Sequence, residues 1–490
     1  MKPLLLEEVK HAIRAEARTV LRRQMITGVS TDSRRVRPGE MFVALRGERF
    51  DGHAFVEAAL GAGASAVLVE RNVPLTAEER QRGVAVLKVD NALEALGRLA
   101  RFYRRELQHS IRVVAVTGSN GKTTTREMIY HAMSRYRKGH RSPHNYNNAV
   151  GVPLTLLGLE PEHEFAVVEM GTSGPGEIAA LARIAEPDIA VITQVGPSHL
   201  EGLRDLDGVS GEKMGIVAGL REHGVLIVGL DHQGVFDRAR ALGCHLITFG
   251  MSERADVSAL RVWREGSRLG FETNDRCTVE LPAAGLHNVS NALAALAACR
   301  RLGLTTRQFA DALRDFQPVP GRLSARQVNG ITILDDSYNA NPSSMAAALA
   351  EIASRTAAGR RIFVCGDMCE LGAASEQYHR DLGRAIAAAP VDLLLTVGSQ
   401  AARTAEAALE AGMGRARVQR CTTAKRLARL IKALLHDEDV ILVKGSRAMA
   451  LEEVVRALER YPGGRPVVAR GRAIGVVGAP RAVRVNVPTG

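Results

Sequence analysis

Aromatic residues and long apolar runs are scarce in this sequence of 490 residues. Phe, Trp and Tyr make up 4% of the chain, with one Trp and seven Tyr. Single-stranded nucleic acid binds on aromatic platforms in a localised basic groove, so this composition argues against a nucleic-acid partner. No run of about 18 apolar residues occurs, so we expect no membrane insertion. The opening MKPLLLEEVKHAIR breaks its short apolar run with two glutamates, unlike the continuous core of a signal peptide.

Cysteines are also few, and none stands in a CxxC pair. The six are Cys244, Cys277, Cys299, Cys365, Cys369 and Cys421. This spacing fits neither a zinc site nor a disulfide framework, and we expect reduced thiols in a cytoplasmic protein.

Positive charge is abundant, and the net charge is +12 at pH 7. Such a balance suits an anionic partner, which could be nucleic acid, a membrane surface or a phosphorylated substrate. Most arginines, however, stand singly in helical patterns such as ALGRLARFYRRELQ, which is typical of a solvated helix face. Charge alone therefore leaves the partner open.

The chain is too long for one hydrophobic core, and about 150 residues per domain predicts about three domains. Residues 1–108 alternate apolar runs such as SAVLVE with helical patterns, as a small α/β domain does. In residues 109–318, IRVVAVTG, FAVVEM, DIAVIT and VLIVG alternate with helical patterns and predict a doubly wound parallel sheet. After the linker FQPVPGR, residues 319–490 predict a Rossmann-like α/β domain, whose Gly-, Arg- and Val-rich tail from about Pro462 has no predicted structure.

Residues 115–125 read AVTGSNGKTTT, an apolar strand end followed by a turn and then a helical pattern. Consecutive backbone N–H groups in such a turn, with the positive end of the helix, bind phosphate. The loop falls short of GxxxxGK, because Val116 stands where the first glycine belongs. An ordinary strand-to-helix turn is the weaker alternative, and the loop alone could serve a kinase, a motor ATPase, a GTPase or a ligase. The residues predicted to bind ATP are Gly118, Ser119, Asn120, Gly121, Lys122, Thr123 and Thr124.

Three downstream residues are candidates for the same site. Glu169 ends the strand FAVVEM, at the sheet edge where open α/β sheets bind ligands, and could share magnesium with the Thr123 hydroxyl. His199 follows the strand DIAVIT; alone, such a histidine is more often structural. Lys213, in VSGEKMGI, would on its own be a solvated helix residue.

The ordered motifs of residues 29–455 together resemble the Mur ligase family. They are VSTDSRRVRPGEMFVAL, GERFDGHAF, TGSNGKTTT, SPHNYNNAVGVPLTLL, VVEMGTSGPGEI, ITQVGPSHLEGL, GLHNVSNALAA, PGRLS, ILDDSYNANPSSM, VCGDMCELG and VKGSRAM. The resemblance implies an α/β protein of three domains, with a central P-loop ATPase-like sheet and a Rossmann-like C-terminal domain.

The resemblance also implies an activity, namely ATP-dependent amide formation through an acyl phosphate in peptidoglycan precursor synthesis. NYNN, DDSYNANP and GDMCELG are typical of the member that adds D-alanyl-D-alanine to UDP-N-acetylmuramoyl-tripeptide, and NANP stands in place of the DNPR motif of an amino-acid-adding member. Two alternatives within the scaffold stay open, a ligase with a different acceptor and a paralogue that only binds. A P-loop ATPase or motor stimulated by nucleic acid is the alternative from another class. We expect a monomer.

Matched positions imply residue roles. Lys122, Thr123 and Glu169 would serve the triphosphate and one magnesium ion, whereas His199 and Lys213 match a second metal site, with Lys213 carried as N6-carboxylysine. A carbamate makes chemical sense there, because a free ammonium has no lone pair for a metal. Asn291 resembles the residue that holds adenine, and Arg322 and Asp336 resemble groups that meet the nucleotide when the third domain closes. Ser33, Arg34, Asp51 and His53 fall in motifs around the UDP end of the substrate.

The sequence departs from the family pattern at three points near the metal and acceptor region. Ser173 and Gly174 replace larger polar residues, Gln194 stands where ITN is usual, and Gly215 stands where relatives carry a glutamate. These departures put the rate, metal preference and acceptor choice in doubt, but they leave the P-loop, Glu169, His199 and Lys213 in place.

Overall fold

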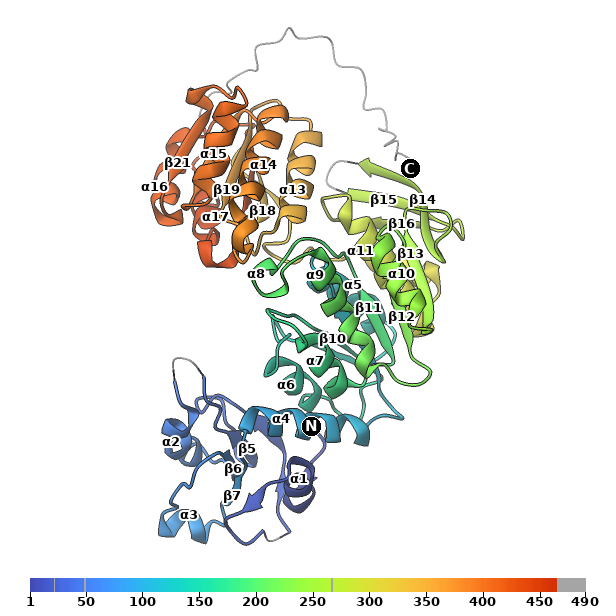
Figure 1. The fold of residues 1–490 in the computed structure, drawn as a ribbon, viewed down its shortest axis with the longest axis vertical. Coiled ribbons are helices and arrows are strands. Elements are labelled where there is room, and N and C mark those ends of the chain that lie inside the picture. The colour runs from blue at the N-terminus through green and yellow to red at the C-terminus, as the bar shows by residue number, and fades with distance from the viewer. Residues whose placement is uncertain (22, 48–49, 266–267, 465–490) are drawn as a thin grey trace.

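The structure, a computed structural model, describes residues 1–21, 23–47, 50–265 and 268–464. Three large sheets, each flanked by helices, follow one another along the described part of the chain (Figure 1). The N-terminal and C-terminal parts lie at opposite ends of an elongated molecule, with the central part between them. The predicted α/β fold of three units is confirmed. Within the described residues, no helix combines the length and apolarity needed to cross a membrane.

The N-terminal part is built on a five-stranded sheet of order β2-β7-β6-β5-β4, in which all neighbours except β2 and β7 are parallel. A short antiparallel pair, β1(Leu4–Leu5) and β3(Met25–Ile26), lies beside it. The sheet strands are β2(Glu16–Ala17), β4(Gly28–Ser30), β5(Glu40–Val43), β6(Ala66–Val69) and β7(Ala85–Lys88). The helices are α1(Leu6–Ile13), η1(Gly52–Phe55), α2(Val56–Gly61), α3(Ala77–Gln81) and α4(Ala92–Glu106).

The central part is built on a nine-stranded sheet of order β16-β15-β14-β13-β12-β11-β8-β10-β9. The strands are β8(Arg112–Thr117), β9(Gly139–Arg141), β10(Phe165–Glu169), β11(Ile189–Ile192), β12(Val225–Gly229), β13(His245–Gly250), β14(Val257–Glu265), β15(Arg268–Thr273) and β16(Thr278–Leu281). The helices are α5(Lys122–Ser134), α6(Gly151–Leu157), α7(Glu177–Ala185), α8(Leu200–Leu203), α9(Leu206–Met214), η2(Gly215–Gly219), α10(Gln233–Ala241), α11(His287–Arg301) and α12(Thr306–Leu313).

Strand β8 explains why this sheet is covered on both faces. Val113 and Ala115 belong to one buried cluster with residues of α6 and α7, whereas Val114 and Val116 belong to another with residues of α5 and α11. Successive side chains of a strand point to opposite faces, so an all-apolar strand needs helices on both sides. The doubly wound sheet expected from the sequence is therefore present.

Two features of the central sheet were not expected. Strand β9 pairs with β10 at one edge, and at the other edge β14 is parallel to β13 whereas β15 and β16 extend the sheet as antiparallel strands. The predicted parallel arrangement therefore holds only from β14 to β9. The short β9 carries the polar GHR, and β14 has charged residues in VSALRVWRE, so neither has the apolar run that marked the buried strands.

The C-terminal part is built on a six-stranded sheet of order β17-β18-β22-β19-β20-β21, parallel except for the edge strand β17. The strands are β17(Ser324–Val328), β18(Ile331–Asp336), β19(Arg361–Gly366), β20(Leu393–Val397), β21(Val418–Cys421) and β22(Val440–Lys444). The helices are α13(Pro342–Ser354), η3(Gly372–Ala374), α14(Ser375–Ala388), α15(Ala401–Glu410), η4(Arg415–Arg417), α16(Ala424–Leu434), η5(Arg447–Met449) and α17(Glu452–Leu458). Division of the chain after residues 108 and 318 stays a prediction, and residues 465–490 of the third predicted domain lie outside the described ranges.

Candidate active site

At two positions of the turn between β8 and α5, only glycine fits. Gly118 and Gly121 have φ values of +147° and +84°. A Cβ atom on Gly118 would lie 2.1 Å from the Thr193 hydroxyl oxygen, and one on Gly121 would lie 2.2 Å from the side-chain oxygen of Asn291. Both glycines are thus required by backbone conformation and by close approach. The turn is held to the sheet because the Ser119 N–H donates to the carbonyl of Gln194 over 2.7 Å.

Lys122 is the first residue of α5 and turns back over this loop. Its Nζ donates to the carbonyl oxygen of Gly118 over 2.8 Å. Loss of hydration, helped by the nearby Arg322 and opposed by Glu169, lowers the pKa of Lys122 to about 8. Arg322 Nη2 also donates to the Thr123 hydroxyl over 3.4 Å. A cation and a hydroxyl therefore face the phosphate cradle, as a P-loop requires.

Glu169 ends β10 and is almost completely buried, with 2% of its surface exposed. Its two carboxylate oxygens accept from Arg126 Nη1 over 3.0 Å and from Asn147 Nδ2 over 2.9 Å. A carboxylate has about four acceptor positions, so these two bonds orient the group and leave capacity for a cation. Sequence reasoning did not assign roles to Arg126 or Asn147, although Asn147 lies in the NYNN motif.

Lys213 lies in the last turn of α9, and its side chain is fully buried. Burial, strengthened by the positive charge of Lys122, lowers the pKa of Lys213 to about 7. Its Nζ has no hydrogen-bond partner within the described part of the chain. The preceding Glu212 accepts from the backbone N–H groups of Gly176 and Ile178 over 2.6 and 2.7 Å, which anchors α9 to the start of α7. A buried amine without a partner is costly and calls for an explanation.

His199 lies just before α8, with a φ of +53°. Its Nδ1 is hydrogen-bonded to Oε2 of Glu370, a residue of the C-terminal part. This partner, 171 residues away, was not predicted from the sequence. The pair lowers the pKa of Glu370 through the hydrogen bond from His199.

Further contacts join the C-terminal part to the loop. Asn341 Nδ2 donates to the side-chain oxygen of Asn120 over 2.9 Å. The Arg322 guanidinium lies over the Tyr338 ring, 4.0 Å from its centroid, and Asp336 forms a 2.7 Å ion pair with the buried Lys444. Arg322 thus reaches the loop, whereas the Asp336 carboxylate is engaged within its own sheet. Asn341 also caps α13, because its side-chain oxygen accepts from the Ser344 N–H over 2.9 Å.

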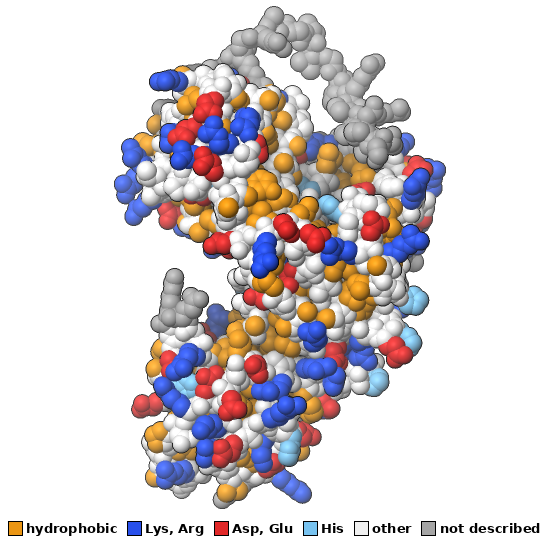
Figure 2. All heavy atoms as spheres, viewed as in Figure 1, with side chains coloured by type: hydrophobic (Ala, Val, Ile, Leu, Met, Phe, Trp, Pro, Cys, Tyr) orange, Lys and Arg blue, Asp and Glu red, His pale blue; other side chains and the backbone are white. Residues whose placement is uncertain are grey.

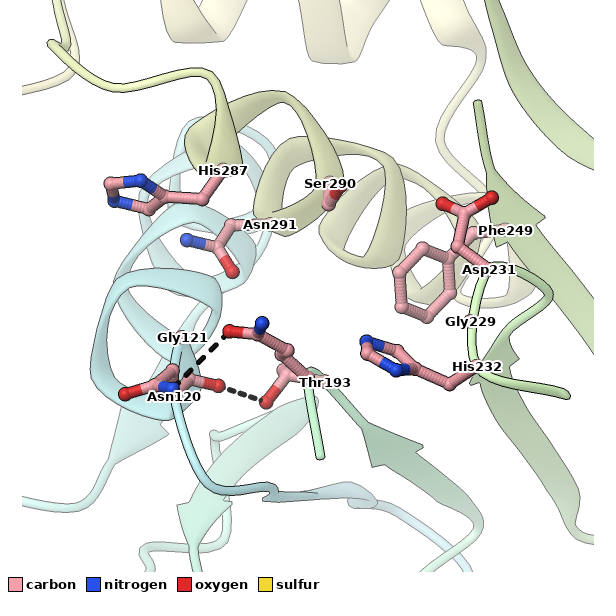
Figure 3. A pocket seen from close by; sticks show the side chains of 11 residues that line it. Asn120, Gly121, Thr193, Gly229, Asp231, His232, Phe249, His287, Ser290 and Asn291 are labelled. Carbon is pink, nitrogen blue, oxygen red and sulfur yellow. Dashed lines mark hydrogen bonds between the residues drawn. The ribbon is translucent and has the colours of Figure 1, made fainter. Parts of the chain in front are cut away.

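A pocket of about 160 Å³ opens beside the phosphate loop (Figure 3). The Asn291 side chain projects from α11 toward the loop, and the rings of His232 and Phe249 lie on the opposite wall. The amide of Asn291 is held by Asn288, to which Nδ2 donates over 2.9 Å. The pocket is lined by Asn120, Gly121, Thr193, Gln194, Gly229, Asp231, His232, Phe249, His287, Ser290 and Asn291. The sequence pointed to Asn291 but not to His232 or Phe249.

This pocket has the mixture of an aromatic wall and a few polar groups that suits a planar base. We expect Asn291→Leu to raise the KM for ATP about tenfold, since a hydrogen bond lost from a buried site costs on the order of 1 to 2 kcal/mol. Initial-rate kinetics with varied ATP would measure the change, and Arg300→Ala, an exposed residue in the last turn of the same helix, is the matched control. An unchanged KM for ATP in Asn291→Leu would contradict this assignment.

The residues predicted near the UDP end lie in the N-terminal part, apart from the phosphate loop. Arg34 is largely exposed and pairs with Asp32 over 2.8 Å, and the pair lowers the pKa of Asp32 to about 2. His53 is inward-facing, because Nδ1 contacts Asp51 at 2.6 Å and Nε2 accepts from the Glu70 N–H over 2.9 Å. Ser33 is partly buried. Residues 48 and 49 of the motif GERFDGHAF lie outside the described ranges.

Two of the departures from the family pattern have structural explanations. Gln194 Oε1 accepts from the Asn120 side chain over 3.2 Å, so it braces the phosphate loop. A Cβ on Gly215 would lie 3.1 Å from the Ala179 backbone nitrogen, so a glycine suits this close packing against α7. The Ser173 N–H donates to Glu177 over 2.8 Å at the start of α7. Nothing in the structure explains Gly174.

Metal coordination remains a prediction. Over the described ranges, no group of three or more His, Cys, Asp and Glu side chains is arranged to hold a metal ion. The predicted donors instead include the Thr123 hydroxyl and a modified Lys213, alongside Glu169 and His199.

These features define a P-loop nucleotide-binding protein. The glycine-rich turn lies at the carboxyl end of parallel strands, and a lysine, a buried carboxylate and a pocket adjoin it. Family models agree in detail. Residues 25–104 match the Mur ligase family catalytic domain, residues 116–299 the Mur ligase middle domain, and residues 321–447 the Mur ligase glutamate ligase domain. The chain belongs to the Mur ligase family.

Known proteins resemble most of the chain. The UDP-N-acetylmuramoyl-tripeptide–D-alanyl-D-alanine ligase of Bacillus subtilis is 39% identical over 89% of this chain and 94% of its own length. That of Escherichia coli is 38% identical with the same coverage. The crystal structure of MurF from Acinetobacter baumannii has a TM-score of 0.84 at 33% identity, covering 94% of this chain and 99% of its own. MurF ligase from Thermotoga maritima, solved with ADP, has a TM-score of 0.78 at 29% identity, covering 89% and 97%.

Proposed function

We propose that this chain is an ATP-dependent ligase that joins D-alanyl-D-alanine to UDP-N-acetylmuramoyl-tripeptide in peptidoglycan precursor synthesis. The observation that carries the proposal is its identity of 39% and 38% to two ligases with this activity in their names, over nearly their whole length. The similarity spans all three parts of the chain, so it includes the parts that would bind each substrate.

The reaction takes place in two steps. The terminal carboxylate of the tripeptide attacks the γ-phosphorus of ATP, forming an acyl phosphate and releasing ADP. The amine of D-alanyl-D-alanine then attacks the acyl carbon, the amide bond forms, and phosphate leaves with the electron pair of the broken C–O bond. Amide formation from a free carboxylate is uphill in water, which is why ATP is consumed.

The chain's own residues supply positioning and charge. The N–H groups of the loop and Lys122 offset negative charge as carboxylate and triphosphate approach. The relative from Thermotoga maritima was solved in complex with ADP, which supports the use of an adenine nucleotide by this chain. The pocket at Asn291 lies beside the loop, where the base of a bound nucleotide would extend.

Two magnesium ions are implied by the family, and the donors present fit them. Thr123, Glu169, His199 and Lys213 would hold the ions, which would supply further neutralisation of phosphate charge. Lys213 fits a carbamate because its Nζ lies buried with no partner among the described residues and its pKa of about 7 keeps much of it neutral. Reaction of that neutral amine with carbon dioxide gives N6-carboxylysine, whose oxygens can bind a cation.

The three parts gather three substrates and exclude water. One side of the molecule is hollowed where the N-terminal and C-terminal parts project beyond the central one (Figure 2). Ser33, Arg34, Asp51 and His53 would support the UDP end from the N-terminal part, with His53 acting through Asp51. Arg322 and Asp336 would act from the C-terminal part. Well-oriented groups reach effective molarities of about 10⁵ M or more, and exclusion of water protects the acyl phosphate.

We place this enzyme in the cytoplasm as a monomer, with its substrates as its partners. On the face in Figure 2, acidic and basic side chains are interspersed, with no continuous basic stripe for nucleic acid. Polyanionic substrates, ATP and a UDP-linked peptide, account for a positively charged chain.

One assay tests the proposal against its alternatives. Purified protein is incubated with ATP, magnesium and UDP-N-acetylmuramoyl-tripeptide, together with either D-alanyl-D-alanine or single amino acids. We expect phosphate release and a product mass increased by the dipeptide less water. Activity with a single amino acid but not with the dipeptide would contradict the proposal. ATP hydrolysis stimulated by polynucleotide and indifferent to the muramoyl substrate would indicate a motor instead, and absence of all turnover would indicate a binding-only paralogue.

A further inference from the structure

His199 and Glu370 meet across the boundary between the central and C-terminal parts. Besides the side-chain bond, the Glu201 N–H donates to the carbonyl oxygen of Glu370 over 3.1 Å. Gly372, the first residue of η3, packs against the backbone of Glu201. The contact therefore joins two backbone segments and is more than a pairing of two long side chains.

Both residues have left-handed backbone conformations, with φ values of +53° at His199 and +62° at Glu370. Such conformations are uncommon for residues other than glycine and carry a backbone strain. They persist where the surrounding structure imposes them, and they cluster at functional sites. Here two of them face each other through a single hydrogen bond.

The loop that carries Glu370 is fixed to its own part of the protein. The Met368 N–H donates to His379 Nε2 over 3.0 Å, and the Cys369 N–H donates to Ser446 Oγ over 2.8 Å. Because the two residues before Glu370 are held in this way, its carboxylate is placed by the C-terminal sheet and helix α14. Glu370 is therefore anchored in the C-terminal part.

The bond determines which nitrogen of His199 is available. An ionised carboxylate only accepts hydrogen bonds, so Nδ1 must carry the hydrogen, and the lone pair of the neutral ring lies on Nε2. Within the described ranges Nε2 has no hydrogen-bond partner, so it is free to bind another group. A carboxylate that orients a histidine in this way commonly supports a metal-binding ring.

We propose that Glu370 is a positioning residue for His199. Its carboxylate holds the hydrogen of the neutral ring on Nδ1, so the lone pair of Nε2 is available to a ligand only while the C-terminal part is docked against the central part. This inference rests on the proposed function, because it gives His199 its task in the ligase. Its consequence is that the site assembles fully only when the part that closes over the nucleotide is in place. Phosphoryl transfer before closure, which would waste ATP, is thereby disfavoured.

The test compares Glu370→Ala, Glu370→Gln and the control Glu376→Ala, an exposed residue at the start of α14 away from the contact. Spectra of protein labelled with ¹⁵N-histidine report the tautomer of His199, whose signal is the one lost in His199→Gln. We expect the Nδ1–H form in the unmodified chain and in Glu376→Ala, partial retention in Glu370→Gln, whose amide oxygen still accepts, and loss in Glu370→Ala.

A second measurement does not depend on turnover. Binding of Mn²⁺ in the presence of ATP, followed by the resonance signal of free Mn²⁺, is expected to weaken about 10- to 100-fold in Glu370→Ala, with a smaller change in Glu370→Gln. Circular dichroism confirms that each variant is folded. An unchanged His199 tautomer or an Mn²⁺ affinity within about twofold in Glu370→Ala would overturn the inference.

The kinetic result separates this inference from the proposed function. In the ligation assay, Glu370→Ala should lower kcat with little change in the KM for the UDP substrate. If the unmodified chain does not use D-alanyl-D-alanine while the tautomer and Mn²⁺ results hold, the proposed acceptor is wrong and the role of Glu370 stands. If ligation is normal while those two results fail, only the role of Glu370 is wrong.

Discussion

Replacing Lys122 with methionine is expected to reduce kcat/KM for ligation at least about 100-fold. Methionine keeps the length and apolar stem of the side chain but removes the only charge that the loop residues 118–124 contribute. Removal of a single preorganised donor from a developing negative charge costs on the order of 10²- to 10³-fold. Single-turnover measurements of phosphate release and product mass would detect the loss, because they separate chemistry from product release.

This loss should occur without loss of the fold. Lys122 has a pKa lowered to about 8, whereas an unfolded chain would have a lysine pKa near its ordinary value of about 10.4. Below pH 8 the folded protein holds a charge that its surroundings disfavour, so removing the charge relieves that cost and stability should be equal or higher. Lys138→Met, just beyond the end of α5, is the matched control and should keep normal activity. Normal turnover by Lys122→Met would refute the role of the lysine.

The sequence predicts those parts of the candidate site that belong to short local motifs. The phosphate loop was predicted because its glycines, lysine and threonines lie in one short run, and the structure shows that a side chain would clash at the two glycines with positive φ. Glu169 and His199 were predicted because Glu169 ends one apolar strand and His199 follows another, and parallel strands end at a common edge. Lys213 had no such signal, and its role was predicted only from the resemblance to a family motif.

The rest of the site depends on contacts between distant residues. Arg126 and Asn147 contact Glu169 from 43 and 22 residues away, and Glu370 contacts His199 from 171 residues away. The motifs NYNN and GDMCELG were recognised, but a motif does not state which partner its polar residue faces. His232 and Phe249 reach the pocket because β12 and β13 are adjacent in the sheet, and that adjacency is a tertiary fact. His53 shows the reverse case, since its position suggested a substrate contact but its ring nitrogens are engaged inside the domain.

The second large effect is expected for Lys213→Ala, which should lose activity by about 100-fold or more and regain part of it with short carboxylic acids. The structure supports this expectation because the amine is fully buried and has no hydrogen-bond partner over the described ranges. Burial of such a group costs free energy that a lysine without a function would not be expected to carry. Alanine leaves a space in which formate or acetate can place a carboxylate where the carbamate oxygens would lie. Ligation rates at increasing acid concentration, at constant ionic strength, would measure the rescue.

The pH dependence of the unmodified chain sharpens this prediction. Only the neutral amine reacts with carbon dioxide, and the pKa of about 7 for Lys213 means that the neutral fraction falls as the pH falls below 7. Activity of the chain without a substitution should therefore decline below pH 7 and be partly restored by added bicarbonate. The Lys213→Ala variant rescued by a carboxylic acid should not respond to bicarbonate. Lys122→Met is the internal control, because no carboxylate can replace a missing cation. Full activity of Lys213→Ala without added acid would refute the carbamate, since the site would then function without any oxygen donor at this position.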